Sequence, residues 1–245
     1  MSYRIFITGS ADGLGLLSAK QLVALGHRVV LHARNRQRAE QALAQVPGAE
    51  AVLVGDLAQP EEIRQLAEQA NASGRFDAVI HNAGVYRASA QEILWVNTLA
   101  PYMLTALMDR PERLIYLSSG LHLQARPDLK AIVAGGIGYS ESKFYLVLLA
   151  KAVARLWPAV YANAVNPGWV PTKMGGPHAP DRLEDGVATQ VWLASSEDPQ
   201  VRTTGRYFHH LREAPYHRQA DDAKLQDAFL EVCAQVTGVV FPGAE

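Results

Sequence analysis

Short apolar runs and amphipathic helical stretches alternate along almost the whole chain. In residues 14–25, for example, an arc of about 140° at 100° per residue contains Leu14, Leu17, Leu22 and Leu25, which marks one buried helix face. The pattern predicts strands at residues 3–7, 28–31, 51–54, 78–80, 114–117, 160–165 and 206–208, and helices at residues 14–25, 36–46, 60–72, 90–108, 139–157, 181–194 and 220–236. Strands that alternate with helices in this way favour a parallel sheet with helices on both faces.

Local signals refine three of these segments. Pro101 lies inside the segment 90–108, so this helix either kinks there or begins near Asn97. Asp181 is expected to cap the helix that follows it. Residues 120–138 show no helical or strand periodicity and are expected to form a loop.

The domain organisation follows from what interrupts the pattern. The stretch 167–180 contains four prolines and three glycines, which predicts a mobile loop. The chain has no internal repeat, low-complexity tract or interdomain linker. We therefore expect a single doubly wound α/β domain over residues 1–245, with a parallel sheet of about seven strands and a helical extension at about 211–245.

Composition excludes several classes of partner. The net charge is −1 at pH 7, so no overall basic field attracts nucleic acid or an anionic membrane. Cys233 is the only cysteine, which excludes an intrachain disulfide and fits a reducing compartment. The first residues lack a signal-peptide layout, and no apolar run approaches the roughly 18 residues that span a bilayer. The sequence therefore predicts a cytoplasmic protein that binds neither nucleic acid nor membranes.

Candidate ligand-binding residues follow the predicted strands. The first strand runs into a turn that contains Gly9, Gly13 and Gly15, and a helix follows. This layout directs backbone N–H groups and a helix N-terminus at a phosphate, although glycines also serve ordinary turns. Ligands bind parallel sheets at the carboxyl ends of the strands. The side chains expected along that edge are Thr8, Ala33, Arg34, Asp56 and Asn82.

A second candidate is the pair Tyr139 and Lys143. Residues four apart lie on the same face of a helix, so the ammonium group is expected near the phenol. A nearby positive charge favours the phenolate and lowers the phenol pKa from about 10, which makes a usable general acid or base. The same spacing also arises by chance on many helices.

Taken together, these motifs resemble the short-chain dehydrogenase/reductase family over nearly the whole chain. The glycine turn, residues 8–15, has the spacing T-G-x-x-x-G-x-G, and residues 81–84 read H-N-A-G where the family has N-N-A-G. Residues at the positions of the family's catalytic tetrad are Asn97, Ser119, Tyr139 and Lys143. The family's P-G motif is matched by Asn166, Pro167, Gly168 and Thr172. The resemblance implies a Rossmann-type domain and an oxidoreductase that transfers a hydride between a nicotinamide and a carbonyl or alcohol.

The resemblance also implies roles for individual residues. Tyr139 would be the general acid or base, and Lys143 would lower its pKa and hold the nicotinamide ribose. Ser119 would bond the substrate oxygen, with the adjacent Ser118 as the alternative. Asn97 would fix a water that relays protons to the lysine. From the residues alone, Ser119 is equally a turn or helix cap and Asn97 a satisfied polar residue of its helix.

Cofactor choice is predicted from the end of the second strand. An acidic residue there would bind both ribose hydroxyls of NAD. This chain has Arg34 instead, with Arg36 and Arg38 nearby, so NADP(H) is favoured over NAD(H). Asp12 in the glycine turn argues against this preference, and the arginines could also be a solvated helix start.

The cofactor-binding residues implied by the resemblance extend across the predicted sheet edge. They are Thr8, Gly9, Ser10, Asp12, Gly13, Leu14, Gly15, Arg34, Asn35, Asp56, Leu57, Asn82, Ala83, Gly84, Tyr139, Lys143, Pro167, Gly168, Val170 and Thr172. Asp56 would bond the adenine edge, or alternatively cap the next helix.

Two departures from the family pattern matter. Tyr139 lies 20 positions after Ser119, a long gap that resembles the retinol-dehydrogenase-like branch. The segment 205–210 lacks the glycine-rich ending of tetrameric members, so a tetramer is in doubt and a homodimer stays open. A metal site is not predicted, because no carboxylate–histidine signature accompanies the histidines His178, His209, His210 and His217.

The substrate is the least determined part of this prediction. Apolar side chains that could line a pocket, or belong to the core, are Trp169, Met174, Trp192 and Tyr207. A mostly apolar ketone or aldehyde, or the matching alcohol, is expected. The alternative function is a non-catalytic NADP(H)-binding redox sensor, which would not need Tyr139 and Lys143 on one helix face. A nucleotide-sugar epimerase is disfavoured by the short chain and the glycine spacing.

Overall fold

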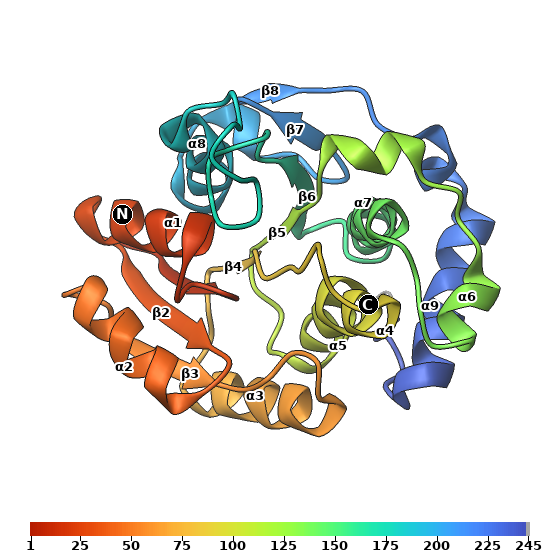
Figure 1. The fold of residues 1–245 in the computed structure, drawn as a ribbon, viewed down its shortest axis with the longest axis horizontal. Coiled ribbons are helices and arrows are strands. Elements are labelled where there is room, and N and C mark those ends of the chain that lie inside the picture. Colours follow the sequence, from red (N-terminus) through yellow and green to blue (C-terminus); the bar gives the residue numbers. More distant parts are fainter. Residues whose placement is uncertain (244–245) are drawn as a thin grey trace.

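In the computed structural model, which describes residues 1–243, one eight-stranded sheet runs through the molecule. The strands are β1 (Arg4–Ile7), β2 (Arg28–Ala33), β3 (Ala51–Val54), β4 (Ala78–His81), β5 (Arg113–Leu117), β6 (Tyr161–Asn166), β7 (Tyr207–His209) and β8 (Arg212–Glu213). Their order is β3-β2-β1-β4-β5-β6-β7-β8, and only the β7–β8 pair is antiparallel (Figure 1). The predicted parallel sheet is thus confirmed, with the two-residue β8 added at one edge.

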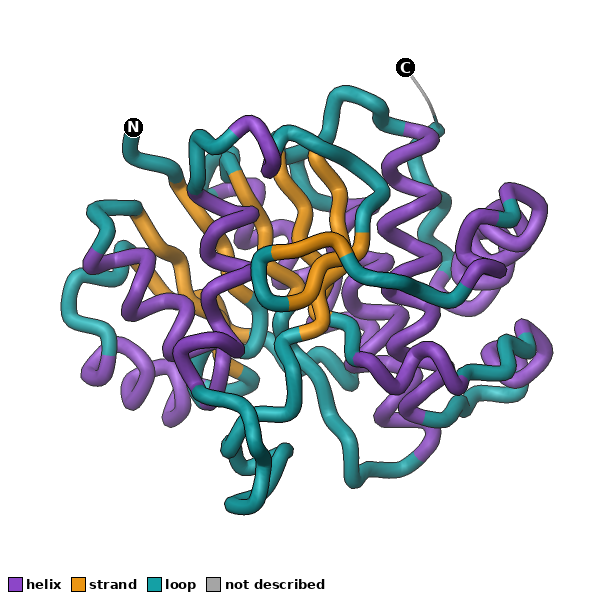
Figure 2. The backbone as a smooth tube through the Cα atoms, turned by 90° about the horizontal axis from the view of Figure 1, so that it is seen from above, coloured by secondary structure: helices purple, strands orange, loops and turns teal. Residues whose placement is uncertain are grey.

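Helices cover both faces of the sheet (Figure 2). They are α1 (Gly13–Ala24), α2 (Arg36–Gln45), α3 (Pro60–Ala72), α4 (Ala90–Leu94), α5 (Ala100–Leu107), α6 (Leu129–Val133), α7 (Tyr139–Leu156), α8 (Leu183–Ser195) and α9 (Ala223–Thr237). Shorter helical segments are η1 (Trp95–Leu99), η2 (Gly120–Gln124), η3 (Pro199–Val201) and η4 (Arg218–Asp221).

Alternation along the central strand creates two separate cores. In β1, Phe6 faces the core shared with α3, α5, α7 and α9, whereas Ile5 and Ile7 face the core shared with α1, α2 and α8. Successive side chains of a strand point to opposite faces, so a strand covered on both faces is apolar except where a polar side chain is paired. The strand β1 has no exposed position. The last three residues of β1 are apolar, and only Arg4 is charged. Its side chain is buried and its guanidinium pairs with Glu50 at 2.8 Å.

The segment 90–107 follows neither of the two predicted arrangements. It is helical throughout, with a π-helical turn at Trp95–Leu99 between α4 and α5. Pro101 has no N–H to donate back into the preceding turn, and it lies in the first turn of α5, where such a donor is not needed. A π-turn inside a helix widens the backbone locally and is frequent at functional sites. It contains Asn97, one of the predicted site residues.

Two further expectations were wrong. Residues 120–138 are not all loop, because they contain η2 and α6, which Ser119 and Asp128 cap through Leu121 N–H and Lys130 N–H. These helices are too short to show periodicity, so the capping residues are the only local sequence signal for them. Asp181 does not cap α8, whose N-cap is the next residue; its carboxylate instead accepts the Trp169 N–H at 2.6 Å.

The C-terminal extension packs against the body of the domain. The helix α9 contacts α6 and α7, and the rings of Tyr145 and Phe229 stack at 5.1 Å (Figure 1). Residues 244–245 of the predicted extension lie outside the described part of the chain. In residues 1–243, no helix combines the length and the apolar character needed to cross a bilayer.

Candidate active site

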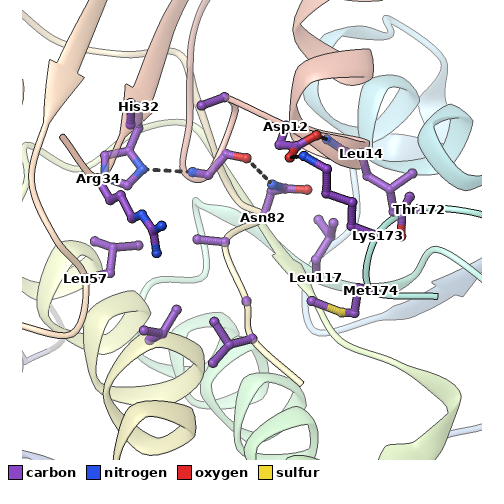
Figure 3. A pocket seen from close by; sticks show the side chains of 18 of the residues that line it. Asp12, Leu14, His32, Arg34, Leu57, Asn82, Leu117, Thr172, Lys173 and Met174 are labelled. Atoms are coloured by element: carbon purple, nitrogen blue, oxygen red, sulfur yellow. Dashed lines mark hydrogen bonds and ion pairs between the residues drawn. The ribbon is translucent and has the colours of Figure 1, made fainter. Parts of the chain in front are cut away.

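A cavity of about 410 Å³ lies at the carboxyl ends of the central strands, where the sequence placed its candidate residues (Figure 3). The predicted residues that line it are Gly9, Asp12, Gly13, Leu14, Ala33, Arg34, Asp56, Leu57, Asn82, Ala83, Gly84, Ser118, Tyr139, Lys143, Pro167, Thr172 and Met174. Residues far apart in the sequence thus meet at one sheet edge, because all strands from β1 to β6 are parallel.

Other predicted residues lie beside the cavity and do not line it. They are Thr8, Ser10, Gly15, Asn35, Asn97, Ser119, Gly168 and Val170. The hydroxyl of Thr8 accepts the N–H groups of Asn82 at 3.0 Å and of Ala83 at 3.1 Å, so it ties two loops together. Asn35 caps α2 by accepting the Arg38 N–H at 3.0 Å. Asp56 does line the cavity and is not the cap of α3, which begins after Gln59.

The glycine turn needs its glycines. Gly9 has φ +64°, and a Cβ there would lie 2.8 Å from the Cα of Ala83. A Cβ on Gly15 would lie 2.4 Å from Nδ2 of Asn82. Both contacts are closer than side-chain carbon atoms tolerate, so the backbone of α1 and the loop after β4 can approach only because Cβ is missing. The N-terminus of α1 at Gly13 opens onto the cavity, which favours an anionic group there.

His32 is a site residue that the sequence prediction missed. It is buried in β2, its Nδ1 accepts the Gly9 N–H at 2.8 Å, and its Nε2 is 2.8 Å from the Gly55 carbonyl oxygen (Figure 3). Since a backbone N–H can only donate, the ring proton must be on Nε2, where it donates to Gly55. Burial lowers the His32 pKa to about 4, so the ring stays neutral at pH 7. The sequence signal that could have identified His32 is its position within the apolar run of β2.

Charged side chains gather at one end of the cavity. Asp12 accepts a hydrogen bond from Arg38 at 3.3 Å and pairs with Lys173 from the loop after β6, and these partners lower the pKa of its carboxyl group. Arg34 is exposed on the cavity wall and, within residues 1–243, forms no ion pair with a carboxylate. The Asp12 carboxylate, which argued against NADP(H) in the sequence analysis, is therefore paired with the cationic side chains of Arg38 and Lys173.

The predicted effect of Lys143 on Tyr139 is wrong in this geometry. Burial raises the Tyr139 pKa to about 12, and the lysine contributes no opposing effect. Its Nζ lies 5.5 Å from the tyrosine ring centre and donates a hydrogen bond of 2.8 Å to the Leu117 carbonyl. Burial also lowers the Lys143 pKa to about 8, which reduces the charge that could act on the phenol.

The structure separates the two adjacent serines. Ser118 is buried and its hydroxyl donates to the Lys143 carbonyl at 2.8 Å. Ser119 accepts the Leu121 N–H at 3.3 Å, and its side chain lies close enough to the Tyr139 phenol to lower the phenol pKa. Ser119 is therefore the serine whose hydroxyl faces the phenol, and it is also the cap of η2.

Asn97 is fully buried and satisfied by the protein. Its Nδ2 donates to the Val85 carbonyl at 2.9 Å and to the Ser142 hydroxyl at 3.0 Å, and its Oδ1 accepts the Val85 N–H at 2.8 Å. A Cβ on Gly84 would lie 3.4 Å from this Oδ1 and 3.3 Å from Nζ of Lys143, so a glycine there lets the loop pass between them. The side chain holds the loop after β4; its role toward a water stays a prediction.

Apolar side chains surround the Tyr139 hydroxyl. The ring of Tyr86 packs edge-on against Tyr139 at 4.7 Å, and the phenol oxygen is 4.0 Å from the Met174 sulfur. Trp169 is 57% exposed on the same loop as Met174. The other two candidates belong to the core: Tyr207 is buried, and the partly buried Trp192 packs edge-on against the Phe208 ring.

Of the two histidines at the end of β7, His209 contacts the backbone, whereas the buried Nε2 of His210 has no hydrogen-bond partner in residues 1–243. The rings of His209 and His210 stack at 3.8 Å, and Nδ1 of His209 is 3.1 Å from the Asn166 carbonyl oxygen. Within residues 1–243, no group of three or more His, Cys, Asp or Glu side chains is arranged to hold a metal ion.

Comparisons with known proteins agree with this geometry. A family model described as short chain dehydrogenase matches residues 4–183. The short-chain dehydrogenase chyC of Penicillium rubens is 42% identical, over 98% of this chain and 99% of its own. Retinol dehydrogenase 14 of Mus musculus is 26% identical, over 96% of this chain and 86% of its own. The crystal structure of a short-chain dehydrogenase from Shigella flexneri 2a, complexed with NADP, superposes with a TM-score of 0.68 at 26% identity and covers 86% of this chain and 98% of that one.

Proposed function

The chain belongs to the short-chain dehydrogenase/reductase family of oxidoreductases, and we propose that it is an NADP(H)-dependent carbonyl reductase or alcohol dehydrogenase with Tyr139 as its general acid and base. The observation that carries this proposal is that Tyr139, with Ser119 close enough to lower the phenol pKa, lines a cavity that begins at the glycine turn. Tyr139, the buried Lys143 and the glycine turn lie on elements that are far apart in the sequence and meet at this cavity.

The residues present fit a nicotinamide dinucleotide. The glycine turn and the N-terminus of α1 would hold the pyrophosphate, and Asp56 would bond the adenine edge. Arg34 would bind the 2′-phosphate of NADP(H), since its guanidinium is exposed and has no carboxylate partner in residues 1–243. Lys143 would hold the nicotinamide ribose. The bound cofactor would supply or accept the hydride.

The protein's own residues would manage the proton. A phenol with a pKa of about 12 is protonated at neutral pH, so Tyr139 would donate its proton to a carbonyl oxygen. Ser119 would donate a hydrogen bond to the same oxygen and stabilise the negative charge that develops there. Oxidation of an alcohol would need the phenolate form of the same residue.

The surroundings of Tyr139 support an apolar substrate. Tyr86 and Met174 offer an aromatic ring and a thioether close to Tyr139. A medium-sized ketone or aldehyde that is mostly apolar, or the matching alcohol, would fit these contacts.

The test is NADPH oxidation by purified protein against a panel of aldehydes and ketones, with NADH in parallel and Tyr139→Phe as the control. We expect turnover that favours NADPH and falls by at least about a hundredfold in the variant. If tight NADPH binding occurs without turnover of any carbonyl or alcohol, the protein is instead a redox sensor, the alternative function. Turnover that survives in Tyr139→Phe would remove the proposed acid.

Assembly and location are separate proposals. We propose a cytoplasmic protein, which suits the single buried thiol of Cys233, and a homodimer. Light scattering of the purified protein would test the second proposal, and a monomer at micromolar concentration would contradict it.

A further inference from the structure

The residue three positions after Ser119 is a fully buried histidine on an otherwise exposed segment. His122 is 0% exposed, whereas its neighbours Leu121 and Leu123 are 37% and 51% exposed. Its ring packs against the Tyr207 ring at 4.6 Å. Burying a polar ring costs free energy unless both nitrogens are paired, so the contacts of these nitrogens show what the ring does.

Both ring nitrogens contact the backbone on opposite sides. Nδ1 is 2.7 Å from the Ser119 carbonyl oxygen, and Nε2 accepts the His217 N–H at 3.2 Å. The His217 N–H can only donate, so Nε2 carries a lone pair and the ring proton lies on Nδ1. Nδ1 therefore donates to Ser119. The ring links the turn that carries the serine to the C-terminal segment before η4.

The charge state of the ring agrees with this arrangement. Burial lowers the pKa of His122, and a positive charge on the facing His217 ring would lower it further. The other titratable group that faces the ring is the Tyr207 phenol. Only the neutral ring can accept the His217 N–H and donate to the Ser119 carbonyl at the same time. A charged ring would point its Nε2–H group at the His217 N–H, and two donors would face each other.

We propose that His122 is a positioning residue, which holds the turn 119–122 so that the Ser119 hydroxyl stays opposite Tyr139. The inference rests on the proposed function, because Ser119 matters to the reaction only if a carbonyl oxygen binds there. It goes beyond the proposed function because it gives the C-terminal segment at His217 a role in holding the reaction site in place. A displacement of about 1 Å at such a hydroxyl is enough to lower a rate by one to two orders of magnitude.

Two substitutions separate the two hydrogen bonds. In His122→Asn the side-chain amide can still donate to the Ser119 carbonyl, as Nδ1 does. In His122→Gln the longer side chain can place its amide oxygen near the position of Nε2 and accept from His217, but it no longer holds an N–H at the position of Nδ1, opposite the Ser119 carbonyl. We expect kcat to fall about tenfold or more in His122→Gln and less than about threefold in His122→Asn, with KM for NADPH unchanged in both.

A double-mutant cycle with Ser119→Ala shows whether the effect passes through the serine. Once the hydroxyl is removed, His122→Gln should lower kcat no further, because residues that act through one group are not additive. An equal loss in the Ser119→Ala background, or a rise in KM for NADPH of similar size, would mean that His122 only stabilises the fold, and would overturn the proposal.

A matched pair at His217 tests the other end of the link. His217→Pro removes the N–H that His122 accepts, at a φ of −66° that proline adopts, whereas His217→Ala keeps it. We expect a lower kcat in the proline variant than in the alanine variant. Equal kcat values in the two would exclude this connection.

One readout does not depend on turnover. Nitrogen-15 NMR of the His122 ring in the full chain should show a neutral ring protonated at Nδ1 at pH 7. A ring protonated at Nε2, or charged, would overturn the linkage even if the protein is an active reductase. Conversely, the expected tautomer in a protein that turns over no carbonyl or alcohol would reject the proposed function and leave the linkage standing.

Discussion

The ammonium nitrogen of Lys143 lies 5.5 Å from the ring centre of Tyr139 and donates its hydrogen bond to the backbone of Leu117. The two side chains share one helix face, as their spacing predicts, yet the lysine does not contact the phenol oxygen. Lys143 is buried and Tyr139 is partly buried, and this burial moves their pKa values in opposite directions, to about 8 for the lysine and about 12 for the tyrosine.

Buried Lys143 should cost the fold stability at neutral pH. Its pKa falls from 10.5 in the unfolded chain to about 8 in the folded one. Between these values the unfolded chain binds a proton that the folded chain does not, so stability rises with pH across this window. Below pH 8 the folded protein bears the whole cost, which is on the order of 3 kcal/mol.

Lys143→Met should therefore be more stable than the wild type at pH 7, by about 1–3 kcal/mol, while losing reductase activity. Urea unfolding of both proteins at pH 7 and pH 10 measures the difference, which should shrink at the higher pH. A variant less stable than wild type by the same amount at both values would contradict the inferred desolvation.

His32 should matter for cofactor affinity more than for stability. His32→Leu leaves the Gly9 N–H in the glycine turn without its acceptor, so we expect the Kd for NADPH to rise about tenfold. His32→Asn can keep the acceptor and should bind more tightly than the leucine variant. Fluorescence titration with NADPH measures the affinities.

The control for this prediction is His81→Leu. His81 is equally buried, but its nearest polar contact is the Thr105 hydroxyl at 3.3 Å, away from the glycine turn. This variant should keep its NADPH affinity. A similar loss in both histidine variants would point to a general loss of folding in place of a local effect on the turn.

Arg34 should decide between the two cofactors. Arg34→Ala is expected to weaken NADPH binding by about ten- to a hundredfold and to leave NADH binding nearly unchanged, since only NADPH carries the 2′-phosphate. Arg36 is also exposed but does not line the cavity, so Arg36→Ala should change neither affinity much. Equal effects on NADH and NADPH in Arg34→Ala would refute a phosphate contact.

The glycine turn offers a steric test. Gly9 and Gly26 both have positive φ, at +64° and +84°, but a Cβ would meet a neighbour only at Gly9, where it would lie 2.8 Å from the backbone of Ala83. Each alanine variant bears the backbone cost of about 1–2 kcal/mol. In urea unfolding, the free energy of unfolding of Gly9→Ala should fall by at least about 1 kcal/mol more than that of Gly26→Ala, because the added Cβ also clashes with the backbone of Ala83. Equal losses would show that the turn can relax.

Much of the fold could be predicted because its signals are local. The two-faced burial of β1 produces an apolar run, the helix faces repeat at 3.6 residues, and the glycines mark positions where Cβ has no room. The order of these elements then brought Thr8, Asn82 and Tyr139 to one sheet edge. The short helices η2 and α6 and the strand β8 were missed because two to five residues carry no periodicity.

What the sequence by itself determined is which residues gather at the strand ends: the glycine turn, the Tyr139–Lys143 pair and the arginine after β2. Only the tertiary structure decided what these residues do to each other, because burial and hydrogen-bond direction depend on partners distant in the chain. It directed Lys143 to the Leu117 carbonyl, raised the pKa of Tyr139 by desolvation, and brought Ser119 near the phenol while the Ser118 hydroxyl donates to the Lys143 carbonyl. The tertiary structure also determined the backbone partners of His32 and His122, which no local sequence pattern predicts.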